Sequence, residues 1–528
     1  MNIRAMPFSG GSGRKPLVAL VFLAFAAVMA YEVAGYVINN DTFGLAYTAL
    51  IFVGGAFVIG MLNDWRNGLY FFLTWLLFED FARKFLGNNM AIYFAKDFLV
   101  LVVYIAYFIA YRRREVQSFR PPFLVPLLML VWFGGMQVFN PGSNHVMFGL
   151  LGFKLFFYYI PLMFVGYSLL ENEGQLRKFF FVNMVLAAII VSLGVAQSII
   201  GPSFLNPAHL ADDIRDLSTL YRTAPISGVT VYRPTSVFVS TGRYSDFLIV
   251  AWMLVFGFSG YLLLRRRQGR VLAFMCMALT FAGVALAASR GVFMWTAITA
   301  VVGSIAFIWG APWRQREVIR VLRTVQRAVL GMVLAMTVLF FTFPDALLGR
   351  LAIYSETLSP YSAANELTHR AGAYPIQNFL GAFDYPRWPY GYGIGTTSLG
   401  VQYVSRFFHE KQSIGSVESG YGALVVEMGI GGLVLWIIMT FSILFAAWRV
   451  VRKLKGSPWF PLAFIIMWYA FILLFPMTFA GIQAYEDFIL NAYLWLLLGI
   501  LFRLPSIALS AQFAAGAGDA SAQRRWVR

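Results

Sequence analysis

Two basic residues stand in apolar surroundings where a positive charge is costly. Lys154 lies in an aromatic, apolar segment, with no acidic residue within one helical turn. An unpaired cation inside a membrane is expensive, so we expect Lys154 to face a polar cavity or an anionic ligand, or to extend to the outer headgroups. Ser289-Arg290-Gly291 separates two apolar segments and predicts a tight helical hairpin. Arg290 would then begin a helix, where it can bind a phosphate or serve as a simple interfacial anchor.

Two further groups of charges have spacings that allow local neutralisation. Residues four apart on a helix are neighbours, and the pairs of opposite charge with this spacing are Glu79 with Arg83 and Asp80 with Lys84. The adjacent residues Lys96 and Asp97 allow a similar local pairing. We interpret the first group as self-neutralised ion pairs near a span end, and leave a functional role open for Lys96 and Asp97 in the fourth span.

Three residues are candidates for a catalytic base. Glu418 directly precedes an apolar segment, near the level expected for Arg290. It can stabilise a helix N-terminus, or it can act as a base in a partly desolvated cleft. His369 and His409 lie in the same loop and are further candidates for this role.

The composition defines the elements that must position these residues. The chain has 528 residues, of which 59% are hydrophobic and only 12% are charged, and its mean hydropathy is +0.70. Soluble domains carry roughly 25% charged residues, so a water-soluble globular protein is excluded. The single cysteine, Cys276, excludes a disulfide scaffold and is expected to be inert packing.

Long apolar segments predict an all-α polytopic membrane protein, with residues 1–528 forming a single integral-membrane domain. About 14 transmembrane helices are expected, near residues 17–38, 43–62, 67–86, 91–111, 123–139, 149–170, 179–200, 245–264, 271–288, 292–310, 327–344, 420–448, 459–480 and 486–502.

The distribution of basic residues predicts the orientation. With alternating spans and a cytoplasmic N-terminus, 27 of the 41 basic residues fall on the cytoplasmic side, and so does the C-terminus. The net charge of +17 is therefore assigned to topology and anionic lipid, and no nucleic acid is expected. Two long segments, 201–244 and 345–418, fall outside as the first long periplasmic loop and the large periplasmic loop before the twelfth helix. Long loops are where function concentrates, so these segments are expected to form the walls of an active site.

The large loop contains features suited to a ligand. Residues 369–380 have amphipathic helical character and are expected to lie along the membrane surface. A glycine-rich turn from Gly391 to Gly395 lets the backbone approach a ligand closely. Trp388 offers a stacking face for sugars, although an interfacial aromatic belt would also explain it.

The order of these motifs, over roughly residues 150–450, resembles the bacterial O-antigen ligase and Wzy-type polysaccharide polymerase superfamily. The matching features, in chain order, are Lys154 in its apolar helix, Arg233-Pro234-Thr235-Ser236-Val237-Phe238, Ser289-Arg290-Gly291, Arg370, the Gly393-Ile394-Gly395 turn, Glu418-Ser419-Gly420-Tyr421, and Glu427-Met428-Gly429-Ile430-Gly431-Gly432.

The resemblance implies a glycosyltransferase of the bacterial inner membrane with a periplasmic active site. An undecaprenyl-diphosphate-linked oligosaccharide would be the donor, and no cofactor, metal or nucleotide sugar would be needed. Ligases of this family carry His-Asn or His-Ser where this chain has Glu418-Ser419, which favours a repeat-unit polymerase over a ligase that transfers glycan to lipid A core. Membrane lipid, a chain-length regulator and a flippase are the expected partners.

The combined reading assigns roles to ten residues. The catalytic candidates are Glu418, Arg290, His369 and His409, and the substrate-binding candidates are Lys154, Arg233, Arg243, Arg370, Tyr421 and Trp388. Cationic groups would stabilise the departing diphosphate, and a single displacement predicts inversion at the anomeric carbon. The main alternative is a secondary transporter or flippase for an anionic envelope precursor, which predicts internal repeats and broken helices around a midplane site. A scaffold of an envelope synthesis complex would not need Arg290 or Lys154.

Overall fold

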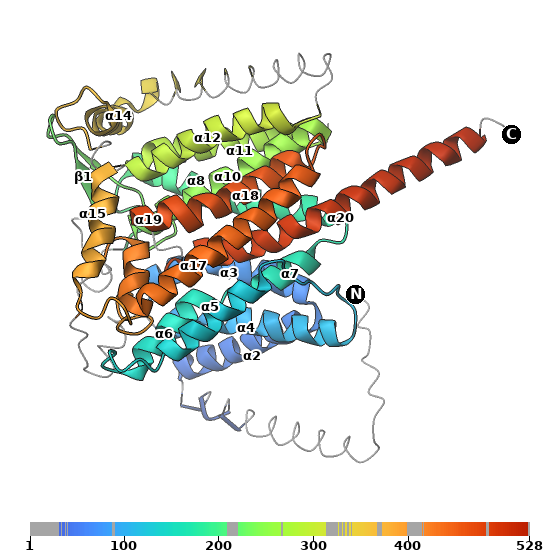
Figure 1. The fold of residues 1–528 in the computed structure, drawn as a ribbon, viewed down its shortest axis with the longest axis horizontal. Helices are drawn as coiled ribbons and strands as arrows, with labels where there is room; N and C mark the ends of the chain where they lie inside the picture. Colours follow the sequence, from blue (N-terminus) through green and yellow to red (C-terminus); the bar gives the residue numbers. More distant parts are fainter. Residues whose placement is uncertain are drawn as a thin grey trace.

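The computed structural model shows a bundle of long helices that lie roughly side by side (Figure 1). It describes residues 41–86, 90–207, 220–265, 268–312, 340–366, 372–398, 417–481 and 485–525, together with residue 414 and isolated positions between 31 and 39 and between 326 and 338.

The first half of the bundle contains these elements: α2 (Thr42–Asn63), α3 (Trp65–Leu86), α4 (Met90–Arg112), α5 (Leu124–Gln137), α6 (Val146–Phe157), α7 (Leu162–Leu169), α8 (Glu173–Ile200), β1 (Tyr221–Thr223), β2 (Thr230–Tyr232) and α10 (Thr241–Arg265). The second half contains these: α11 (Arg270–Leu286), α12 (Arg290–Gly310), α14 (Pro344–Leu358), α15 (Tyr374–Leu380), η4 (Gly381–Asp384), α17 (Gly420–Lys453), α18 (Phe460–Ile472), η5 (Leu473–Met477), α19 (Thr478–Ala480) and α20 (Phe488–Arg525).

The helices confirm the class of an all-α membrane protein. Within the described ranges, eight helices are long and apolar enough to cross a bilayer, and three shorter apolar helices accompany them. The count of 14 spans stays a prediction, since residues 1–30 and most of the segment expected near 327–344 lie outside the described residues.

Helix α10 lies at the centre of the bundle, and 83% of its apolar window is buried. It packs against α8, α11, α12, α18 and α20, so its apolar residues surround the whole helix rather than one face. Beside it, α7 packs along α20, where a Cβ on Gly499 would collide with the carbonyl oxygen of Met163. Small residues at such contacts let two helix backbones approach closely, as is common inside membranes.

One end of the bundle gathers the elements from both predicted long loops; we call it the loop end. The antiparallel pair β1 and β2 comes from segment 201–244, and α14 and α15 come from segment 345–418. Figure 1 shows them together at the left, while α20 projects from the opposite end. Helix α15 falls within the segment for which a helix is expected, 369–380.

Helix α17 is interrupted near the loop end. Gly429 has a φ of 69°, and a Cβ there would lie 2.5 Å from the carbonyl oxygen of Pro389. The glycine-rich turn fills this break, because the N–H groups of Tyr392 and Gly393 donate to the carbonyls of Val426 and Glu427 at 2.8 and 2.9 Å. The glycine-rich turn therefore has a structural role, because its backbone is hydrogen-bonded to α17 at the break.

Candidate functional site

The hairpin between α11 and α12 places Arg290 at the loop end. As the sequence predicts, only three residues separate the two helices, and α12 begins at Arg290. Ala288 in this turn has a φ of 50°, a conformation that non-glycine residues rarely adopt and that often occurs at functional sites. Its side chain joins Ala224, Val231 and Ile353 in a small apolar core that fixes the turn against the β-strands and α14.

A pocket of about 290 Å³ opens beside this turn. Strand β1, helix α12 and the end of α14 contribute to its lining, which consists of Arg222, Ser289, Arg290, Gly291, Met294, Leu358 and Glu366. The pocket thus combines cationic side chains with the apolar side chains of Met294 and Leu358.

Three arginines at the loop end have defined partners: Arg290 and Arg222, which line the pocket, and Arg350, which is buried. Arg290 Nη1 lies 2.5 Å from the Oε1 atom of Glu366. Arg222 donates to the carbonyl of Ala288 at 3.1 Å, and Arg350 donates to those of Leu286 and Tyr232 at 2.7 and 2.8 Å. Arg222 and Arg350 therefore stabilise the C-terminal end of α11, as cations do at the negative end of a helix dipole. Arg222 and Arg290 line the pocket and carry five N–H donors each, which leaves donors for a ligand.

Four arginines at this end raise the local positive potential. Burial lowers the pKa of Arg222 to about 10, and the charges of Arg233 and Arg290 contribute to the shift. Burial also lowers the pKa of Arg350 to about 10 and, with the charge of Arg290, lowers that of Arg233. A bound anion would relieve the repulsion among Arg222, Arg233 and Arg290, so the cluster is suited to a multiply charged anion such as a diphosphate.

Arg233 leads a buried segment that connects the pocket to the helix core. The side-chain oxygen of Gln197 accepts from the backbone N–H groups of Thr235 and Ser236 at 2.8 and 2.7 Å. The ammonium of Lys84 donates to the Thr235 hydroxyl at 3.0 Å and to the Ser236 carbonyl at 2.5 Å. Gln197 and Lys84 thus position the segment. Sequence reasoning missed both roles, because Thr235 lies 38 residues from Gln197 and 151 residues from Lys84 along the chain.

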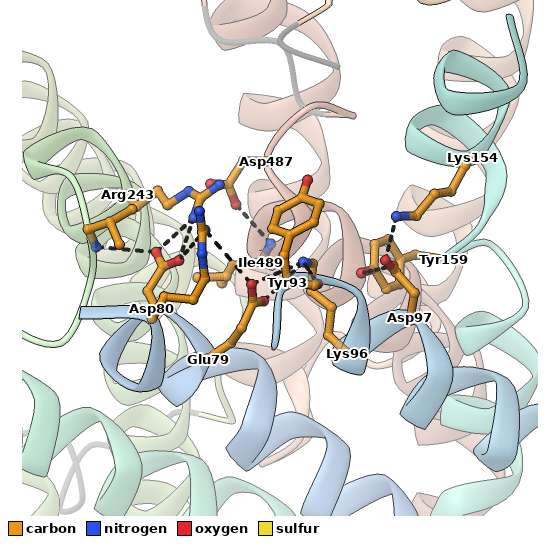
Figure 2. A network of polar contacts seen from close by, with 12 residues as sticks. Glu79, Asp80, Tyr93, Lys96, Asp97, Lys154, Tyr159, Arg243, Asp487 and Ile489 are labelled. Atoms are coloured by element: carbon orange, nitrogen blue, oxygen red, sulfur yellow. Dashed lines mark hydrogen bonds and ion pairs between the residues drawn. The ribbon is translucent and has the colours of Figure 1, made fainter. Parts of the chain in front are cut away.

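A buried network of charges links α3, α4 and α10 (Figure 2). Both oxygens of Asp80 accept from Arg243, at 2.7 and 2.8 Å, and Oδ1 also lies 3.1 Å from Arg83. Glu79 pairs with Lys96 at 3.0 Å. The side chains of Asp80 and Glu79 are almost completely excluded from the surface, so these pairs compensate charges that would otherwise be very costly.

The network corrects the sequence reading of several charges. Lys154 is paired with Asp97, which comes from α4 rather than from its own helix (Figure 2). The local pairing expected between Lys96 and Asp97 is therefore wrong, since each residue pairs with another helix. Arg243 is likewise occupied by Asp80. A sequence shows only neighbours along the chain, whereas these partners meet through helix packing.

The pairs expected within α3 are found in part. Arg83 Nη1 lies 3.9 Å from Glu79, as the spacing predicts, but it lies closer to Asp80, at 3.1 Å. Asp80 was expected to pair with Lys84, and the structure instead joins Asp80 to Arg243 and Lys84 to the segment after Arg233.

The remaining candidates either do not line the arginine pocket or are residues that the structure does not describe. Glu418 is exposed and precedes Ser419, whose hydroxyl caps α17 by accepting from the N–H of Gly422. Tyr421 is buried, with its hydroxyl donating to the carbonyl of Leu474, and the ring of Trp388 packs edge-on against Phe383. Among the site candidates, the structure does not describe His369, Arg370 and His409.

The structure also reveals a pocket residue that sequence reasoning missed. Glu366 pairs with Arg290 and lines the pocket, yet it is 76 residues away along the chain. Its only sequence signal is an acid in the large predicted loop.

No protein-family model and no curated protein matches this chain.

Proposed function

We propose that the protein is a polysaccharide polymerase that transfers a glycan from a lipid diphosphate to a sugar hydroxyl of another lipid-linked repeat unit. The observation that carries this proposal is the arginine pocket at the loop end, where Arg222 and Arg290 line a cavity with Arg233 and Arg350 nearby. Within the proposal, the loop end faces the periplasm of a bacterial inner membrane, and the donor is linked to undecaprenyl diphosphate.

The chemistry of a diphosphate leaving group matches this charge arrangement. Negative charge accumulates on the departing phosphate oxygens, and guanidinium groups already held in place stabilise the transition state without reorganising. Removing one preorganised donor typically lowers the rate by about two to three decades. Arg290 is the best placed donor, because it lines the pocket at the first residue of α12.

A lipid-linked donor also fits the apolar side of the pocket. Met294 in the lining begins a stripe on one face of α12 that continues through Ile298, Val301 and Ile305. The last three are exposed, and they recur at the spacing of a helical face. In a bilayer this face would contact lipid, so a polyprenyl chain could leave the pocket along it while its diphosphate stays on the arginines.

The experiment that tests the proposal is incubation of the purified protein with a defined undecaprenyl-diphosphate-linked repeat unit. A ladder of longer lipid-linked glycans supports a polymerase, and transfer to lipid A core instead assigns a ligase. Transport is the second candidate, because broken helices such as α17 at Gly429 are typical of transporters. Movement of the unaltered donor across vesicles, without new glycosidic bonds, would favour it.

A further inference from the structure

We propose that Glu366 is the general base of glycan transfer, and that binding of the donor diphosphate to Arg290 increases the proton affinity of this carboxylate. This inference rests on the proposed function, because it places a lipid diphosphate and an acceptor hydroxyl in the arginine pocket. It differs from the assignment of the base to Glu418 or to a histidine of the large loop.

Glu366 is held at the mouth of the pocket. Its Oε1 atom lies 2.5 Å from Arg290 Nη1, and its backbone N–H donates to the carbonyl of Thr357, at 3.1 Å, near the end of α14. The side chain of Glu366 is 40% exposed, whereas that of Arg290 is 19% exposed. The carboxylate is therefore the more accessible partner of the pair, and an acceptor sugar can reach it.

The charges of the pocket couple this base to the donor. Arg290 contacts Glu366, and Arg222 also interacts electrostatically with it. These positive charges stabilise the ionised carboxylate, which is then a poor proton acceptor. A diphosphate carries more negative charge than a carboxylate and competes for the same guanidinium. When Arg290 turns to the diphosphate, Glu366 lies beside new negative charge, which favours its protonated form. Proton transfer to it is thus promoted only when the donor is bound.

The reaction step balances without a further reactant. The proton of the acceptor hydroxyl passes to the Glu366 carboxylate as the acceptor oxygen forms a bond to the anomeric carbon. The bond from the anomeric carbon to the donor phosphate oxygen breaks, and its electron pair leaves with the lipid diphosphate. Arg290 and Arg222 hold the resulting negative charge.

The test compares Glu366→Gln, Glu366→Asp and wild type with the same lipid-linked repeat unit. We expect Glu366→Gln to lower kcat by about 10²- to 10⁴-fold, because general-base catalysis contributes this much, and to lower the donor KM by about 2- to 5-fold, because the competing carboxylate is gone. Glu366→Asp should recover part of the rate, and the acidic limb of the pH–rate profile should disappear in Glu366→Gln. Glu356→Gln is the matched control, since Glu356 is an acid of α14 that accepts hydrogen bonds from the β1–β2 turn and does not line the pocket.

Binding of inorganic pyrophosphate provides a second readout that needs no turnover. Removing the competing carboxylate should tighten pyrophosphate binding by about 2- to 5-fold, since exposed ion pairs contribute up to about 1 kcal/mol. Wild-type kcat in Glu366→Gln, or a loss of turnover in Glu418→Gln alone, overturns the assigned base while the polymerase proposal stands. Absence of glycan transfer by wild type overturns the proposed function, and unchanged pyrophosphate affinity in Glu366→Gln overturns the exchange at Arg290.

Discussion

Asp80→Asn should destabilise the protein strongly, because it removes the acid that compensates the buried Arg83 and the half-buried Arg243. The Asp80 side chain is 2% exposed, and its oxygens accept from Arg243 at 2.7 and 2.8 Å and lie 3.1 Å from Arg83. Removing one partner of a buried ion pair costs about 3–5 kcal/mol, because a charge is left without compensation. Asparagine retains one oxygen acceptor, so we expect a loss of about 3 kcal/mol in the free energy of unfolding.

The assay is denaturant unfolding in detergent micelles, followed by fluorescence of the chain's 14 tryptophans. Glu171→Gln is the matched control, because its pair with Arg66 is exposed, at 50% and 31%, and should contribute at most about 1 kcal/mol. Combining Asp80→Asn with Arg243→Gln should cost less than the sum of the single changes, by about 0.5–3 kcal/mol. An Asp80→Asn midpoint equal to wild type would refute the view that this network holds α3 against α10.

Three further changes test other parts of the account. Gly429→Ala places a side chain at a φ of 69° against a backbone oxygen, and should lower unfolding stability by about 1–3 kcal/mol; an unchanged midpoint contradicts the break in α17. Gln197→Ala leaves the backbone N–H groups of Thr235 and Ser236 unpaired, and should cost about 1–3 kcal/mol for each group in the same assay. Burial raises the pKa of Glu486 to about 8, so the folded protein holds this proton more tightly than the unfolded chain does. The free energy of unfolding should therefore fall as pH rises from about 5 to 8. Glu486→Gln should flatten that pH dependence, and an unaltered curve would show that Glu486 does not cause it.

Much of the fold was predictable because apolar periodicity is a local property. Helices α10, α12 and α17 begin within a few residues of their predicted spans, since charged or glycine-rich residues end each apolar segment. The interruption of α17 was not predictable from hydropathy. It depends on backbone hydrogen bonds from the turn around Tyr392, which is distant in sequence.

The sequence predicted a site residue correctly only where its position follows from the residues next to it in the chain. The hairpin at Arg290 follows from two adjacent apolar segments, and the structure places it in a pocket. Lys154 appeared unpaired because its partner, Asp97, is 57 residues away. Glu366 was missed for the same reason, since its relation to Arg290 exists only after α14 and α12 pack at the loop end.

The most direct measurement of the central claim is the rate at which Arg290 variants elongate a defined lipid-diphosphate-linked repeat unit. Arg290→Ala should lose about two to three decades in rate relative to wild type, and Arg290→Lys should remain impaired because an ammonium lacks the planar fork that binds phosphate. Both variants should fold normally by the fluorescence assay. Elongation by Arg290→Ala at the wild-type rate would contradict the assignment of the arginine pocket to the donor diphosphate.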